Sequence, residues 1–497
     1  MLPAPSRSPK FKNNYKNVAM APKISLNAQN LEALGAMRLA ELLIEISDGN
    51  APVKRRLRLE LAGAQSPDEA SREIRKRLSA ISRSRTFVDW QNRRGLMEDL
   101  QTQRRAIVDH VAKTDPKEAL ELMWSFMGLA SSVFARCDDS SGTVIGIFRE
   151  GVSDLGRLAE AAKGDAADLA DRTFQALLDK DYGQFDHLIA ALRPAPGDVG
   201  LEHLKLRVIA LSKEPVKKPK DQERRKVGWS MSGPIYEDEI ENHHRASVIL
   251  LALRDIADAQ GDVDGFIAQY DARTRKVPKI AAEISRRLLA AGRADEALQT
   301  VNAAEHSRPA WPVFEWEDAR IDALEALNRS KDAQAARWSC FERFLSARHL
   351  REYLKRLPDF DDIEAERRSL DYVENFKSLA HALSFLATWP ALDRAARLVE
   401  GRAGELNGDH YEVLTPVAEA LAGKQPLAAT LALRAMIEFS LDQSRSSRYK
   451  HAARHFQECS SLATTIVDFG KWETHDCFVK RLREKHGKKS SFWGLVK

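Results

Sequence analysis

The organisation of this chain is clearest in one stretch of its second half, which reads Ala281-Ala-Glu-Ile-Ser-Arg-Arg-Leu-Leu-Ala-Ala-Gly-Arg-Ala-Asp-Glu-Ala-Leu-Gln-Thr-Val-Asn-Ala-Ala304. We interpret it as a helix, a Gly-Arg turn at 292–293, and a second helix, because glycine commonly ends helices and acidic residues favour their first turn. Residues 319–341 repeat this outline, with Leu327-Asn-Arg-Ser-Lys-Asp-Ala333 at the turn. The stretch therefore predicts a helical hairpin, and its recurrence predicts an array of hairpins.

The turns of these hairpins recur at a nearly constant interval. Asp295 and Asp332 are 37 residues apart, and the later turn residues Pro390 and Pro426 are 36 apart. These intervals are close to the roughly 34 residues of a tetratricopeptide repeat (TPR), although the full signature of that repeat is absent. Such units bury their apolar faces on their neighbours. We therefore predict an all-α fold in which residues 243–497 form a helical-hairpin repeat array, a TPR-like α-solenoid.

The first half of the chain has helical signals without a comparable repeat. An apolar stripe runs from Leu31 to Ile46 and stops at an Asp-Gly-Asn turn, as expected for an amphipathic helix. Ser66 followed by Pro67 is typical of the start of another helix. No alternating run of apolar residues predicts a sheet. We therefore expect an N-terminal helical domain at residues 24–212.

Residues 213–242 interrupt the helical pattern. They begin with Lys213-Glu-Pro-Val-Lys-Lys-Pro-Lys-Asp-Gln-Glu-Arg-Arg-Lys226, which is highly charged, contains proline and lacks an apolar stripe. A short Gly-Pro piece follows at 233–234. This composition indicates a charged linker or long loop between the two helical domains.

The overall composition is that of an ordinary helix-rich protein. Of 497 residues, 43% are hydrophobic and 30% charged, and glycine and proline are sparse. No apolar run approaches the roughly 18 residues that a membrane-spanning helix needs. The four cysteines, at 137, 340, 459 and 477, form no CxxC pair, which is typical of a reducing compartment. We therefore expect a cytoplasmic protein that makes no contact with a membrane.

The excess positive charge is concentrated at the N-terminus. The net charge is +5, and residues 1–25 contain five basic residues and no acidic one: Arg7, Lys10, Lys12, Lys16 and Lys23. We expect residues 1–23 to form a disordered basic tail, with Met20 as an alternative natural start. The remainder of the chain is close to neutral and gives little general support for a nucleic-acid-binding body, although a local basic patch stays open.

The densest group of chemically capable side chains lies at residues 445–461. Tyr449, Phe456 and Cys459 recur at helical spacing and therefore share one face, which we expect to be buried. The basic residues beside that face define a candidate anion- or partner-binding edge, made of Arg445, Arg448, His451, Arg454 and His455.

Two groups of residues suggest a metal site as an alternative. His451 and His455 lie one helical turn apart, as in the zinc motif HExxH, but Ala452 occupies the place of the glutamate. Residues 237–244 collect four carboxylates and two histidines, which suit a divalent ion or acid–base chemistry. Acidic residues also favour the start of a helix. We predict no metal, no cofactor and no catalytic residue.

Five stretches carry a resemblance to a known family. They are Asn30-Leu-Glu-Ala-Leu-Gly35, Arg136-Cys-Asp-Asp-Ser-Ser-Gly142, Gly233-Pro-Ile-Tyr-Glu-Asp-Glu239, Leu354-Lys-Arg-Leu-Pro-Asp-Phe-Asp-Asp362 and Arg448-Tyr-Lys-His-Ala-Ala-Arg-His455. Together they resemble an uncharacterised bacterial family of unknown function over about residues 20–497. From about Ala319 onward the chain is also similar to C-terminal regions of bacterial SWIM-type zinc-finger proteins. That finger needs a Cys-x-Cys pair, which this chain lacks, so no zinc ligand is carried over.

The resemblance implies a helical-repeat body and no established activity. Repeat arrays commonly present an extended surface to another protein. We therefore expect a non-enzymatic protein-interaction scaffold with a protein partner. The alternatives are a nucleic-acid-associated accessory protein that uses the basic edge, and a metal-dependent enzyme built on one of the histidine groups.

Overall fold

The computed structural model describes residues 26–179, 182–216, 219, 224–231, 233–304 and 313–496. The expectation for residues 1–23 therefore lies outside the described residues. The chain divides into two compact units, of which unit 1 ends at Gly265 and unit 2 begins at Phe266. We describe each unit by itself.

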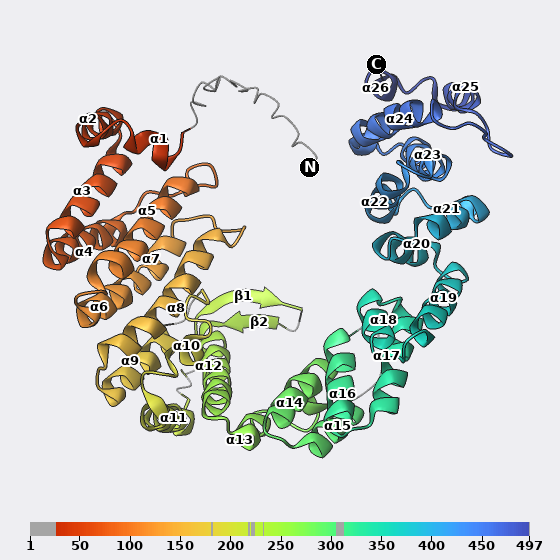
Figure 1. Ribbon diagram of the computed structural model, residues 1–497. Helices are drawn as coiled ribbons and strands as arrows, with labels where there is room; N and C mark the ends of the chain where they lie inside the picture. Colours follow the sequence, from red (N-terminus) through yellow and green to blue (C-terminus); the bar gives the residue numbers. More distant parts are fainter. Residues whose placement is uncertain are drawn as a thin grey trace, which may run out of the picture. The chain divides into compact units, whose positions relative to one another are not determined.

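Unit 1 is built almost entirely of helices (Figure 1). Its elements are α1 (Ala28–Glu32), α2 (Ala36–Ser47), α3 (Ala51–Gln65), α4 (Pro67–Arg83), α5 (Arg93–Ala106), the π-helix η1 (Ile107–Val111), α6 (Pro116–Met127), α7 (Ala130–Phe134), α8 (Thr143–Ala162), α9 (Ala166–Leu178), α10 (Leu188–Leu192), α11 (Gly197–Lys213), β1 (Lys226–Ser230), β2 (Gly233–Tyr236) and α12 (Glu237–Gln260). The short α13 (Val263–Ala268) crosses the boundary between the units.

Side chains at the helix starts satisfy free backbone donors. The hydroxyl of Ser66 accepts a hydrogen bond from the Glu69 amide at 3.2 Å, and Pro67 occupies the first turn of α4. Asn50 and Asp115 cap α3 and α6 in the same way. The predicted start at Ser66 is therefore confirmed.

The expectation of no sheet was wrong in one place. Strands β1 and β2 form an antiparallel hairpin within the expected linker, followed directly by α12 (Figure 1). Every residue of β1 is exposed or half-buried, and Trp229 is exposed. Because the hairpin has no buried face, its sequence lacks the alternation that normally reveals a strand. The proposed division at residues 213–242 stays a prediction, since unit 1 also contains all of α12.

Unit 2 is a succession of helices without a strand among its described residues. Its elements are η2 (Thr274–Lys276), α14 (Pro278–Ala290), α15 (Ala294–Asn302), α16 (Phe314–Ala326), α17 (Ser330–Phe344), α18 (Ala347–Leu354), α19 (Asp361–Glu374), α20 (Leu379–Thr388), α21 (Leu392–Gly401), η3 (Ala403–Glu405), α22 (Tyr411–Leu421), α23 (Pro426–Asp442), η4 (Ser446–Arg448), α24 (Tyr449–Ala463), α25 (His475–His486) and α26 (Ser490–Trp493). The all-α prediction is confirmed.

Two hairpin turns of unit 2, at Gly292 and Asn328, share one backbone geometry. Gly292 and Asn328 both adopt a positive φ, +75° and +58°. The next residue in each case, Arg293 or Arg329, donates its amide to the helix carbonyl five positions earlier, at 2.8 and 2.9 Å. This is the Schellman pattern, which glycine and asparagine tolerate best. The two turns are thus 36 residues apart, one fewer than the alignment of the aspartates indicates.

The C-terminal end of unit 2 is closed by α26. The Phe492 side chain is completely buried and contacts the rings of Tyr449 and Phe456, with centroids 6.0 and 6.4 Å apart. Lys489 donates a 2.8 Å hydrogen bond to the Ser444 hydroxyl just before α24. The terminal segment therefore folds its aromatic residues inward and leaves its polar residues outside.

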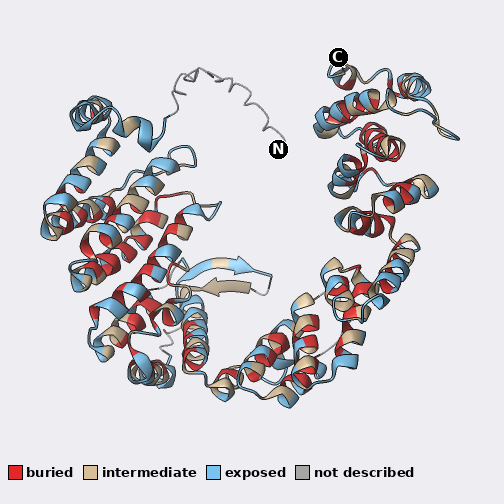
Figure 2. Cartoon of the chain, in the orientation of Figure 1, coloured by how far each residue is buried: buried red, intermediate tan, exposed pale blue. Residues whose placement is uncertain are grey.

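The first helices that the structure describes in unit 1 have the opposite character. Helix α2 is apolar on most of its faces, yet only its Ser47 is buried. Figure 2 shows α2 as mostly exposed, whereas the helices that follow it carry a buried interior.

Among the described residues, no helix is both long enough and apolar enough to cross a bilayer. The four cysteines are free thiols, of which Cys137, Cys340 and Cys459 are buried and Cys477 is exposed.

Candidate functional site

Unit 1 contains a groove of about 840 Å³ that we call the α3–α8 groove. Its walls come from α3, from α5 with the adjoining π-helix η1, and from the first two turns of α8. It is larger than three pockets that the described residues of unit 2 form, which have volumes of about 570, 460 and 430 Å³. The walls of the groove are far apart in the sequence, so no single segment of the chain could reveal it.

The π-helix shapes one wall of the groove. A π-helix inserts an extra residue into a helical turn and often occurs at functional positions. Here it carries Asp109 and His110, both of which line the groove. The Nε2 atom of His110 lies 3.1 Å from the Glu60 carboxylate of α3. Gly63 permits this approach, because a Cβ atom there would lie 2.7 Å from the His110 ring.

The side chains of the groove carry both signs of charge. Glu150 of α8 lines the groove and pairs at 2.7 Å with Arg104 of α5, which does not line the groove itself and also pairs with the buried Asp154. Gln101 donates to the same Glu150 carboxylate at 3.0 Å. Other charged residues lining the groove are Arg55, Arg56, Glu60, Glu98, Asp99, Arg105 and Asp109. A surface of this kind suits a polar peptide with its own mixed charges better than a uniformly anionic polymer.

The segment 136–142, one of the stretches that carry the family resemblance, builds the α8 end of the groove. The Asp139 carboxylate accepts hydrogen bonds from the amides of Val144 and Ile145, at 3.0 and 2.8 Å, and so caps α8. Arg93 donates to the Asp138 carbonyl at 3.1 Å and ties this segment to α5. These bonds give the segment a positioning role at the groove.

The basic edge predicted on α24 is only partly formed. Arg448 pairs with Asp409 at 2.8 Å and lies over the ring of Tyr411. Arg454 is 3.6 Å from Glu458 on its own helix. Arg445 and His451 are exposed. Two of the arginines are therefore beside carboxylates, which reduces their attraction for another anion.

His455 does not belong to that edge, which corrects its predicted placement. Its side chain is buried with Tyr449, Phe456 and Cys459, all of which the helical spacing correctly placed in the core. Burial, with a smaller contribution from Arg454, lowers the pKa of His455 to about 4. The physical reason is the helix angle: position 455 is adjacent to Phe456 and Cys459 on the packed side of α24. The remaining edge residues stay a prediction as a binding site.

The acidic cluster at 237–244 has a structural role in this fold. Arg224 contacts Asp238 and Glu239 at 3.1 and 2.7 Å and lies over the Tyr236 ring. Arg225 pairs with Glu237 at 3.2 Å. These ion pairs join the hairpin to the first turn of α12. Among the residues that the structure describes, no three His, Cys, Asp or Glu side chains are arranged so that they could hold a metal ion.

A buried arginine lies at the C-terminal end of unit 2. Arg434 of α23 is 5% exposed and donates one hydrogen bond, at 2.9 Å, to the Glu473 carbonyl. Its guanidinium lies 4.5 Å from the Phe478 ring centroid, and burial lowers its pKa. It borders a pocket of about 460 Å³, where Arg481 bridges Glu438 and Glu473 at 2.5 Å each. This network ties the loop before α25 to α23.

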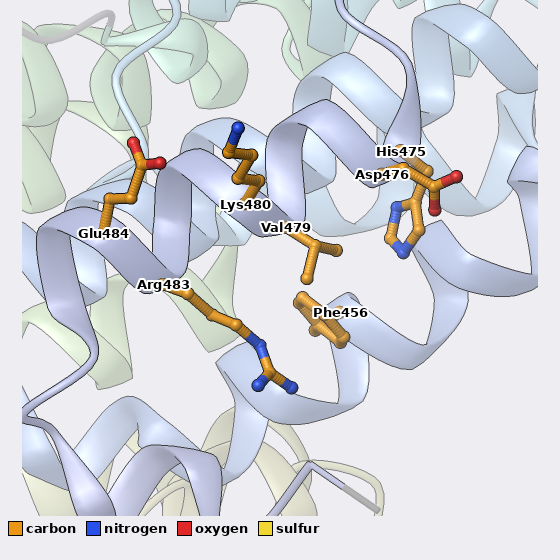
Figure 3. Close-up of a pocket in the computed structure, with 7 residues that line it drawn as sticks. All are labelled: Phe456, His475, Asp476, Val479, Lys480, Arg483 and Glu484. Carbon is orange, nitrogen blue, oxygen red and sulfur yellow. The ribbon is translucent and has the colours of Figure 1, made fainter.

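A second recess in this part of the chain lies between α24 and α25 (Figure 3). Val479 and Arg483 point toward Phe456, while Lys480 and Glu484 project from the other side of α25. The Nε2 atom of His475 shares a 2.9 Å hydrogen bond with the Ser460 hydroxyl, and burial lowers the pKa of His475. The recess is therefore apolar at its base and charged at its rim.

The α3–α8 groove was not found from the sequence. Its residues come from positions 52–150 and meet only through folding. The one sequence signal is indirect: the family-like segment at 136–142 contains Asp139, which caps α8, and Gly142, which lines the groove.

The fold and the groove define an all-α protein of helical hairpins. The model of the family described as a family of unknown function (DUF6880) matches residues 21–495. The chain therefore belongs to this family. A search of curated proteins finds no match.

Comparison with solved structures gives a match to a circular tandem repeat protein with novel repeat topology and enhanced subunit contact surfaces. The two chains are 14% identical, and the match covers 94% of this chain and 97% of the other. The TM-score is 0.15, so this likeness carries no argument about the arrangement of the helices.

Proposed function

We propose that this protein is a non-enzymatic protein-interaction scaffold and that the α3–α8 groove holds a polar peptide segment of a partner. The observation that carries the proposal is the mixed charge of the groove, which is lined by arginines from α3 and α5 and by carboxylates from α3, α5, η1 and α8. Opposite charges arranged along a groove fix the register of a bound peptide and reject unsuitable partners.

Two helical glycines make the groove testable without damage to the fold. Gly95 of α5 and Gly146 of α8 both line the groove, and a Cβ atom at either position would meet nothing within 4 Å. Replacement of a helical glycine by a better helix former also favours the helix. Gly146→Leu and Gly95→Leu should therefore fill the groove while the protein stays folded.

The matched control is Gly401→Leu at the end of α21 in unit 2. A Cβ atom at Gly401 also meets nothing within 4 Å, and this position is remote from the groove in sequence. Affinity capture with the wild-type protein and Gly401→Leu should recover a common partner, and Gly146→Leu should lose it. Equal recovery with all three proteins, or no partner above background with the wild type, would contradict the proposal.

The alternatives have weaker support but have direct tests. A nucleic-acid-associated role through Arg445, Arg448, His451 and Arg454 requires binding that weakens steeply as salt rises. A metal-dependent enzyme requires stoichiometric metal in protein that is purified without chelator. The TPR-like character of the array, the SWIM-type likeness, the bacterial origin and the cytoplasmic location likewise stay predictions.

A further inference from the structure

The arginines that line the α3–α8 groove have no partner within the chain. Arg55 and Arg56 of α3 and Arg105 of α5 form no hydrogen bond or ion pair with a residue that the structure describes. Arg56 and Arg105 are exposed, and Arg55 is half-buried. A guanidinium group presents a planar set of donors that matches a carboxylate. The groove therefore offers three sets of unused donors to a ligand.

The carboxylates of the groove are in a different situation. Four of the five that line it lie within ion-pair distance of a basic side chain of unit 1. These pairs are Glu60 with His110 at 3.1 Å, Glu98 with Arg94 at 2.8 Å, Glu150 with Arg104 at 2.7 Å, and Asp99 with Arg77. Among the described residues, no basic side chain pairs with Asp109. Three unpaired arginines thus stand against one unpaired carboxylate, so the unused charge of the groove is positive.

The base of the groove holds an unused hydrogen-bond acceptor. Gln103 lines the groove but is only 4% exposed. Its Nε2 atom donates to Asp99 at 3.4 Å, whereas its Oε1 atom has no hydrogen-bond partner among the described residues. A buried acceptor without a donor costs free energy and is uncommon in folded proteins. The main chain of a peptide carries N–H donors, whereas a phosphodiester backbone carries none.

We propose that the segment held in the α3–α8 groove is a peptide of net negative charge. Its aspartate or glutamate side chains bind Arg55, Arg56 and Arg105, and one of its main-chain amides donates to the Gln103 carbonyl. The assignment rests on the proposed function, because it concerns the occupant of the same groove. Nucleic acid suits the groove less well, since its closely spaced phosphates would be repelled by the carboxylates that line the groove. A peptide can place its acidic residues at intervals and avoid them.

A synthetic array of short peptides that differ independently in acidic and basic content tests the charge of the occupant. Binding of the labelled full chain should increase with the number of aspartate and glutamate residues. It should be lost in Gly146→Leu and retained in Gly401→Leu. Binding that depends on Gly146 but not on acidic content would overturn the acidic assignment and leave the peptide groove in place. If no array peptide distinguishes Gly146→Leu from the wild type, both proposals are contradicted.

Substitution of single arginines tests the contacts. Arg56→Gln and Arg105→Gln should each weaken the binding of the best acidic array peptide about tenfold, because each removes a charge-assisted hydrogen bond. Fluorescence anisotropy of the labelled peptide measures the affinity. The matched control is Arg58→Gln, since Arg58 is an exposed arginine of the same α3 that does not line the groove. It makes the same change in net charge and should leave the affinity unchanged.

Asp109→Asn tests the sign of the effect. It removes the unpaired carboxylate of the groove and should strengthen the binding of the same acidic peptide. Equal affinities of Arg56→Gln, Arg105→Gln and Arg58→Gln would overturn the assignment. Tighter binding of a single-stranded oligodeoxynucleotide than of the acidic peptide would also overturn it. Circular dichroism of each variant identifies any loss of fold.

Discussion

At the C-terminal end of unit 2, the four-residue α26 turns Phe492 into the core and holds its position through Lys489. Among the first helices that the structure describes in unit 1, the twelve-residue α2 buries only a serine. The shorter helix is thus the better packed one. A helical array needs a terminal element with a polar outer face, and length contributes less to this than the placement of one or two large side chains.

The largest expected effect comes from Phe492→Ala. Removal of a buried aromatic side chain costs about 3–5 kcal/mol, and here it opens contacts to Tyr449, Phe456 and Trp493. Hydrogen exchange measured by mass spectrometry should show faster exchange confined to α24, α25 and α26. Exchange that stays unchanged in these helices would show that α26 does not close this end.

A second effect concerns pH at the same closed end. Because the folded pKa of His455 is about 4, below its ordinary value of 6.5, the unfolded chain binds the proton more readily. The free energy of unfolding therefore has its full value above about pH 6.5. It decreases by about 3 kcal/mol as the pH falls from 6.5 toward 4. The free energy of local opening of α24 can be measured by hydrogen exchange at pH 7 and at pH 5. In His455→Leu it should decrease less between pH 7 and pH 5 than in the wild type. An identical pH dependence in the variant and the wild type would show that His455 is solvated.

A smaller effect is expected at the start of α4, where the helix depends on one local hydrogen bond. Ser66→Ala removes the hydroxyl that accepts the Glu69 amide at the start of α4, and loss of such a cap costs about 1 kcal/mol. The expected result is faster exchange in the first turn of α4. Ser66→Asp retains a capping oxygen and should behave like the wild type.

The smallest effect is expected within α2 itself. Ile44→Ala changes a side chain that is 70% exposed, so the free energy of unfolding should change by less than about 0.5 kcal/mol. The measurement is thermal unfolding followed by circular dichroism. A loss comparable to that of Phe492→Ala would show that α2 is packed within its own chain.

Much of the local structure could be predicted because it depends on neighbouring residues. The turn at Gly292 and the cap at Ser66 follow from backbone geometry that few residue types tolerate. The burial of Cys459 follows from helical spacing.

The features that the sequence did not reveal depend on distant contacts. The groove joins residues of α3, α5 and α8, and the π-helix that contains His110 has no sequence signature. The burial of His455 was not predicted because this residue lies at the border between the two faces of α24. The packing of neighbouring helices, here α23 and α25, determines whether such a residue is buried.

The distribution of the cysteines has a practical consequence. Burial raises the pKa of the Cys340 and Cys459 thiols to about 12 and also raises that of Cys137. The thiolate is the form that reacts with alkylating reagents, so these three buried sulfurs should react more slowly than an exposed thiol while the protein is folded. Cys477 is exposed at the start of α25. The native sequence thus offers a single exposed attachment point for a fluorophore or spin label, in the first turn of α25.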